Sequence, residues 1–218
     1  MGAVKILVTA FEPFGGDPEN ASLEAVTRLA RAASSEGPGR LGLPPHVELA
    51  TGVLPVAFAT ADAALAALVA EHRPDAVLAV GEAGGRAAIT PERWGANEDD
   101  ARMPDNVGEQ PRARRIHADG PERRASALDV DAMVAAIRAA GVPAEASDDA
   151  GRFLCNHVAY RVAALAVPGG FVHVPAVRSR GTAGVGGETD AGASTAATDL
   201  TFDDLARGLA AAVAAIAR

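Results

Sequence analysis

The sequence has little cysteine, fewer basic than acidic residues and no long apolar run, and each of these shortages argues against a class of protein. Its single cysteine, Cys155, cannot form an intramolecular disulfide, which excludes a small domain stabilised by disulfides. The 20 basic residues against 28 acidic ones give a net charge of −8, which argues against a partner held through nucleic-acid phosphates. No apolar run approaches the ~20 residues that a membrane-spanning helix needs.

The residues that are present fit a globular chain. Hydrophobic residues make up 49% of the 218 positions and charged residues 22%, which is typical of a folded protein and not of a disordered one. This length suits one large domain or two small ones. The start, Met1–Val8, is too short an apolar stretch for a secretory signal, so we expect a cytoplasmic protein with a reduced thiol.

Short β-branched runs alternate with longer alanine-rich segments of helical period. The predicted strands are Lys5–Thr9, Val47–Leu54, Ala76–Val80 and Phe171–Val174. The predicted helices are Ser22–Ala33, Ala57–His72, Val130–Ala140, Cys155–Ala166 and Phe202–Ala217. This alternation predicts one three-layer α/β/α domain over residues 1–218, with a mostly parallel central sheet covered on both faces.

Three stretches lack this alternation. Gly37–Pro45 is rich in glycine and proline and predicts a surface excursion. Ser179–Thr198 is rich in small and polar residues and predicts a mobile segment. Gly81–Arg124 has no clear period, and a polar loop of that length is usually functional or disordered.

Ligands of an open parallel sheet bind beyond the carboxyl ends of its strands. Ala10–Gly16, Gly81–Arg86 and His173–Pro175 all leave predicted strand ends, and Cys155 follows a turn at the start of a helix. We therefore expect Cys155, His173 and the long loop to meet at one edge of the sheet.

A cysteine hydrolase needs a thiolate, a histidine and a group that orients the imidazole. The first turn of a helix would lower the pKa of Cys155 through the macrodipole and unpaired N–H groups. His173, near the end of an apolar strand, is the best base, although position alone favours a core histidine by roughly two to one. His157 would point about 200° away from Cys155 on a helix, which indicates a structural role. The remaining histidines, in loops or at a helix end, are expected to be solvated: His46, His72 and His117.

Spacing does not choose the orienting carboxylate. The long loop offers Glu82, Glu92, Glu98, Asp99, Asp100 and Asp105. Glu92 differs only in that an apolar residue and a proline precede it closely. The glycine-rich turn Gly81–Arg86 lacks the spacing of a phosphate-binding loop and better suits a neutral amide ligand. The sequence has no CxxC or HExxH pattern, and we expect neither a metal nor a cofactor.

Six ordered motifs resemble pyroglutamyl peptidase type I (pyrrolidone-carboxylate peptidase), a family of cysteine peptidases, over nearly the whole chain. The motifs are Thr9–Gly16 with Asn20, Val80–Arg86, Ile89–Arg93, Ala101–Asn106, Phe153–His157 and Gly170–Pro175. The resemblance implies hydrolysis of the amide bond after an N-terminal pyroglutamyl residue of peptides. It also implies that Cys155 is the nucleophile, His173 the base and Glu92 the orienting carboxylate. For His173 this overrides the preference for a core histidine that position alone gives.

The resemblance also implies which residues form the substrate pocket. Phe11 and Phe14 of the first motif would line it, Phe153 would extend the apolar wall, and Arg102 would stabilise the oxyanion together with the Cys155 N–H. Asn20 and Glu82 are the polar residues expected beside them. The implied partners are N-terminally pyroglutamylated peptides, with no nucleic acid and no membrane. Bacterial members of the family are often homotetramers, so a dimer or tetramer is an alternative to a monomer.

Several positions depart from the family pattern. Ala10 stands where the family usually has Gly and would narrow a turn, and Trp94-Gly95 is unusual after Arg93. Glu82 stands where Gln is usual and would set a carboxylate at the pocket edge. A family contact through the backbone would make that change mild, whereas a contact through the side chain would alter specificity. Two alternatives therefore stay open: an amidohydrolase for another lactam or amide, and a non-catalytic binding protein that keeps the fold.

Overall fold

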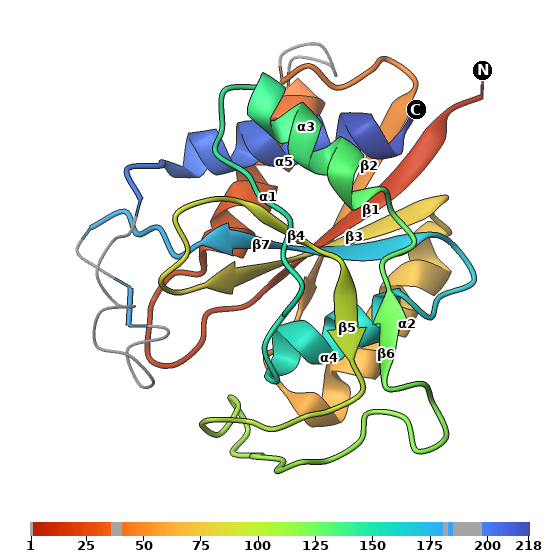
Figure 1. Cartoon of the computed structure of the whole chain (residues 1–218). Coiled ribbons are helices and arrows are strands. Elements are labelled where there is room, and N and C mark those ends of the chain that lie inside the picture. The colour runs from red at the N-terminus through yellow and green to blue at the C-terminus, as the bar shows by residue number, and fades with distance from the viewer. Residues whose placement is uncertain (1, 36–40, 181–182, 185–197) are drawn as a thin grey trace.

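The computed structural model describes residues 2–35, 41–180, 183–184 and 198–218, and its elements are arranged around a five-stranded sheet (Figure 1). The strand order is β2-β1-β3-β7-β4. Four of these strands are parallel, and the edge strand β4 is antiparallel to β7. The strands are β1 (Val4–Phe11), β2 (Val47–Leu54), β3 (Ala76–Ala83), β7 (Gly169–Pro175) and β4 (Thr90–Glu92).

Helices cover both faces of this sheet, which confirms the predicted α/β fold with a mostly parallel sheet (Figure 1). One face carries α1 (Ala21–Ser35), α3 (Val130–Ala139) and α5 (Phe202–Ile216). The other face carries α2 (Phe58–His72) and α4 (Leu154–Val162). None of the helices in the described ranges is long and apolar enough to cross a membrane.

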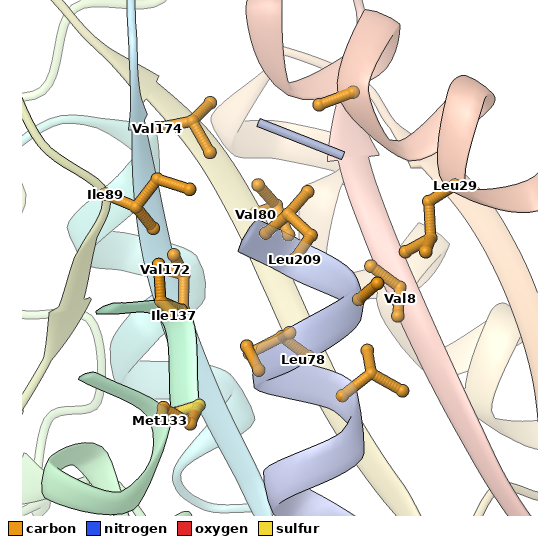
Figure 2. Close-up of a cluster of buried hydrophobic side chains, with 14 of the residues drawn as sticks. Val8, Leu29, Leu78, Val80, Ile89, Met133, Ile137, Val172, Val174 and Leu209 are labelled. Atoms are coloured by element: carbon orange, nitrogen blue, oxygen red, sulfur yellow. The ribbon is translucent and has the colours of Figure 1, made fainter. Parts of the chain in front are cut away.

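The central strands read as continuous apolar runs because both of their faces are buried. Successive side chains point to opposite faces of the sheet. Leu78 accordingly belongs to the cluster on the side of α5, which Figure 2 shows together with Leu209. Its neighbours Val77 and Ala79 belong to the cluster under α2 and α4. Two separate cores therefore hold the sheet rigid from both sides.

Two predicted boundaries differ from the structure for local reasons. Helix α4 ends at Val162 and not at Ala166, because the next amides form three-residue turns: Ala164 N–H donates to Arg161 and Leu165 N–H to Val162. Ala10 lies within β1 and is fully buried, so the prediction that it narrows a turn was wrong.

The long loop Gly81–Arg124 is largely ordered, although it has no sequence period. It contains β4, β5 (Trp94–Ala96) and the start of β6 (Arg123–Ala125), and the last two pair antiparallel in a second small sheet. Strands of three residues are too short to show alternation. Buried polar side chains hold the rest: Asp105, for example, accepts N–H bonds from Val107, Glu109 and Phe58.

Two other predicted segments are described only in part. Residues 36–40, which include the first part of the expected excursion Gly37–Pro45, lie outside the described residues. Leu43, later in that excursion, is buried against the core. The predicted mobile segment Ser179–Thr198 also falls mostly outside them.

We predict that Gly95→Ala destabilises the fold. A Cβ at Gly95 would lie 2.3 Å from the Tyr160 backbone nitrogen and 2.7 Å from the Ala159 carbonyl carbon, and the α4 backbone cannot move cheaply. Overpacking of this kind costs about 3 kcal/mol, so the Tm should fall by roughly 6–12 °C in thermal unfolding. Gly2→Ala, where the added Cβ meets nothing within 4 Å, is the control. Equal Tm values for the two variants would contradict the close packing of β5 on α4.

Candidate active site

A cavity of about 300 Å³ opens at the carboxyl ends of β1, β3 and β7, beside the start of α4. The expected residues that line it are Phe11, Phe14, Asn20, Glu82, Arg102, Phe153, Cys155 and His173. Glu92 does not line the cavity but contacts His173 from the β4 side. The strand ends therefore bring Cys155, His173 and the long loop together, as the sequence predicted.

His173 and Glu92 form a buried hydrogen bond. The distance from His173 Nδ1 to Glu92 Oε1 is 2.7 Å, and the two side chains are 4% and 1% exposed. β4 pairs with β7 so that Thr90 lies opposite His173 and Glu92 opposite Phe171. Because a carboxylate only accepts, Nδ1 donates the proton and Nε2 is left unprotonated. That tautomer is the one that can take a proton from a thiol.

Cys155 lies in the first turn of α4 and packs against Gly81. A Cβ at Gly81 would lie 2.8 Å from Cys155 Sγ and 2.7 Å from Phe171 Cζ. Gly81 and His173 are register partners on adjacent strands, so a side chain at Gly81 would share the face of His173. The missing side chain at Gly81 thus makes room for the sulfur on the His173 face.

Burial decides the protonation states of the resting site. It raises the pKa of Cys155 to about 12, which Arg102 and Arg86 oppose and Glu92 reinforces. The predicted lowering of this pKa was therefore wrong, because desolvation of the thiol is the largest effect on it. Burial also lowers the pKa of His173. The resting pair is a neutral thiol and a neutral imidazole.

The charge of Glu92 is preserved in spite of burial. Burial alone would raise its pKa, but the His173 hydrogen bond and the charge of Arg86 hold the pKa of Glu92 below its ordinary value. Arg86 Nη1 donates to Glu92 Oε1 at 2.7 Å and also contacts Thr90, while Nη2 donates to the Asp149 carbonyl at 3.0 Å. The sequence placed Arg86 in a motif, but nothing indicated that it would hold the orienting carboxylate.

Aromatic rings form the apolar walls of the cavity. Phe14 and Phe153 have ring centroids 5.0 Å apart, and Phe58 meets the edge of Phe153 at 5.4 Å. The guanidinium of Arg102 lies 5.5 Å above the Phe153 ring. Phe58, at the start of α2, does not line the cavity but supports Phe153, and no motif in the sequence indicated it.

Asn20 lines the cavity, but its polar atoms bond within the protein. Its Nδ2 donates to the Glu12 carbonyl at 3.1 Å, and its Oδ1 accepts from the N–H and hydroxyl of Ser22. Asn20 therefore closes the start of α1 and steadies the loop behind Phe11.

His157 lies outside the cavity and joins three segments. Its Nδ1 is 3.0 Å from both oxygens of Asp99 in the long loop, and its Nε2 is 3.0 Å from Asp62 on α2. Burial would lower the pKa of His157, but the two carboxylates raise it. This position fits the structural role expected from sequence.

We predict that His157→Ala lowers the Tm, and more so in acid than in alkali. A histidine whose pKa is raised on folding contributes stability below its unfolded pKa, and that stability is lost as pH rises through the folded pKa. Breaking the pair with buried Asp99 should cost about 3 kcal/mol, or roughly 6–12 °C, near pH 6. The gap to wild type should narrow near pH 9 in thermal unfolding, with His72→Ala as control. A Tm difference between wild type and His157→Ala that stays constant or grows with pH would contradict a raised pKa for His157 in the folded protein.

The comparisons with known proteins identify the family of the chain. Residues 4–218 match the family model described as pyroglutamyl peptidase. The pyrrolidone-carboxylate peptidase of Streptococcus pyogenes serotype M5 is 40% identical over 219 residues, covering 98% of this chain and 92% of the relative. That of Streptococcus suis strain 05ZYH33 is 42% identical over 178 residues, covering 79% of this chain and 78% of the relative.

Solved structures give the same result. The crystal structure of pyroglutamyl peptidase I from Bacillus amyloliquefaciens superposes with a TM-score of 0.81 at 33% identity, covering 98% of this chain and 97% of that one. The pyrrolidone carboxyl peptidase from Thermococcus litoralis gives a TM-score of 0.79 at 29% identity, with 98% and 93% covered. On the family model and these relatives, the chain belongs to the pyroglutamyl peptidase family, whose members are cysteine peptidases.

Proposed function

We propose that this chain hydrolyses the amide bond that follows an N-terminal pyroglutamyl residue of peptides and proteins, with Cys155 as nucleophile, His173 as base and Glu92 as orienting carboxylate. The observation that carries the proposal is the 2.7 Å His173–Glu92 hydrogen bond, buried beside a cavity that also holds the only cysteine. Family membership supports the same substrate class.

The shape and polarity of the cavity fit a pyroglutamyl group. This lactam is flat and uncharged, so it favours apolar faces with a few polar contacts to its ring amide. Phe11, Phe14 and Phe153 offer such faces, and the turn at Ala83-Gly84 brings backbone to the cavity wall. An N-terminal glutamine or glutamate would leave its ammonium unpaired in the cavity, which weakens the binding of both.

Acylation begins with proton transfer. The Cys155 S–H proton passes to His173 Nε2, and the thiolate attacks the pyroglutamyl carbonyl carbon. The resulting oxyanion lies at the first turn of α4, where the Cys155 N–H has no partner within the helix, and Arg102 lies on the same cavity wall. The C–N bond then breaks as the imidazolium gives its proton to the departing amine.

Deacylation repeats these roles with water. His173 takes a proton from water and the hydroxide attacks the thioester. The C–S bond then breaks as the imidazolium returns its proton to the sulfur, which releases pyroglutamate and restores the thiol and the neutral imidazole. In both steps Glu92 stabilises the imidazolium, which would otherwise be an unpaired buried cation. A lone thiol nucleophile works best where it stays reduced, so we also propose a cytoplasmic location.

The test is hydrolysis of a pyroglutamyl chromogenic amide, with prolyl and glutaminyl amides beside it. Cys155→Ala should reduce kcat by at least about 10⁴-fold, because no other thiol exists. Glu92→Gln should reduce kcat by about 10² to 10⁴-fold, because its amide can hold the wrong imidazole tautomer. Glu98→Gln, an exposed carboxylate of the same loop, is the matched control.

Two outcomes would overturn the proposal. Near wild-type hydrolysis by Cys155→Ala would exclude the thiol as nucleophile. Faster hydrolysis of the prolyl or glutaminyl amide would favour the alternative amidohydrolase. Iodoacetamide labelling decides less, because the raised pKa of Cys155 makes labelling slow in an active enzyme as well.

A further inference from the structure

Glu82 and Arg178 form a buried ion pair beside the cavity. Their side chains are 5% and 3% exposed. Arg178 Nη1 donates to Glu82 Oε2 at 2.6 Å, and Nη2 donates to Oε1 at 2.7 Å. Such a two-bond pair fixes both the charge and the orientation of the carboxylate, and lysine cannot reproduce it.

Further contacts on each partner balance the remaining charge. Glu82 Oε2 accepts the N–H of Ala21 at 2.5 Å, at the first residue of α1, where the helix dipole favours an anion. Arg178 Nη2 also donates to Asp17 Oδ2 at 2.6 Å. Both oxygens of Glu82 are therefore engaged inside the protein, and the carboxylate expected at the pocket edge does not act as a free charge.

The ion pair also connects two segments that carry cavity walls. Asp17 lies in the loop 12–20 that also holds Phe14, and Arg178 follows β7, which holds His173. In Figure 1 the chain leaves β1 and β7 on the same side of the sheet. The guanidinium of Arg178 thus bridges the aromatic wall and the strand of the base.

An uncompensated charge on Glu82 would affect both substrate and nucleophile. Burial raises the pKa of Glu82, and Arg178 opposes that rise. Burial is also the main cause of the raised pKa of Cys155, and the negative charge of Glu82 adds to it. Without Arg178, a desolvated anion would face a neutral lactam and a forming thiolate; among the described residues, the Ala21 N–H would remain as its hydrogen-bond donor, and Asp17 would repel it.

We propose that Arg178 is a positioning and specificity-determining residue: it neutralises Glu82, so that the part of the cavity wall at Glu82 presents no net charge to the lactam ring. The inference rests on the proposed function. It also explains how a glutamate can occupy position 82, where the family pattern has an uncharged side chain, because Arg178 supplies the opposite charge.

The test is the Arg178→Met variant with the pyroglutamyl chromogenic amide. KM should rise about tenfold near pH 8, with a smaller fall in kcat, because the uncompensated Glu82 opposes binding of the uncharged ring. KM should recover as the pH is lowered and Glu82 is protonated. Adding Glu82→Gln to this variant should restore KM to within about threefold of wild type. Arg207→Met, which removes an arginine on α5, is the matched control.

A second variant covers the case in which Arg178→Met does not fold. Glu82→Gln alone should leave KM within about threefold of wild type, because Arg178 keeps Asp17 as a partner. The KM of Arg178→Lys, which keeps the positive charge but not the two-bond geometry of the guanidinium, should lie between those of wild type and Arg178→Met. A tenfold rise in KM for Glu82→Gln, or a folded Arg178→Met with wild-type KM at every pH, would overturn the proposal.

A substrate-free measurement separates this inference from the proposed function. The rate constant for iodoacetamide labelling of Cys155 should fall roughly threefold in Arg178→Met and return in the double variant. If wild type hydrolyses no pyroglutamyl amide but these labelling rates hold, the substrate assignment fails and the Glu82–Arg178 coupling stands. Unchanged labelling together with unchanged KM would contradict the coupling itself.

Discussion

The hydrogen bond between His173 and Glu92 is the constraint on which the rest of the site depends. It joins the last parallel strand to the antiparallel edge strand β4, and both side chains are almost completely buried. A buried imidazole without this partner would have no fixed tautomer and could not become a cation at tolerable cost. Arg86 holds the same carboxylate oxygen, so Glu92 keeps its negative charge although it is buried behind the cavity.

The same low-polarity environment explains why Cys155 is a thiol at rest. The start of α4 favours the thiolate, but desolvation is the larger effect and raises the pKa of the sulfur. The nucleophile must therefore form together with the imidazolium, as a pair that Glu92 stabilises. Aromatic walls that suit a flat neutral lactam thus lie beside a thiol whose desolvation keeps it protonated until proton transfer to His173.

Much of the fold followed from sequence, since strands buried on both faces appear as continuous apolar runs; the bounds of Val47–Leu54 were predicted in full. The three-residue strands β4 and β5 were missed because no period can show at that length. The Glu92–His173 contact joins residues 81 apart in the chain, so spacing could not select Glu92 and only the family resemblance did. The Glu82–Arg178 pair, 96 residues apart, left no local pattern either.

Trapping the acyl-enzyme tests the central claim most directly. During turnover of an activated pyroglutamyl ester, acylation should outpace thioester hydrolysis, so rapid acid quenching should preserve the intermediate. Intact-mass and peptide mass spectrometry should then show one added pyroglutamyl group, located on the peptide that contains Cys155. An acyl group on another residue, or continued turnover by Cys155→Ala with no acyl group trapped, would contradict the account.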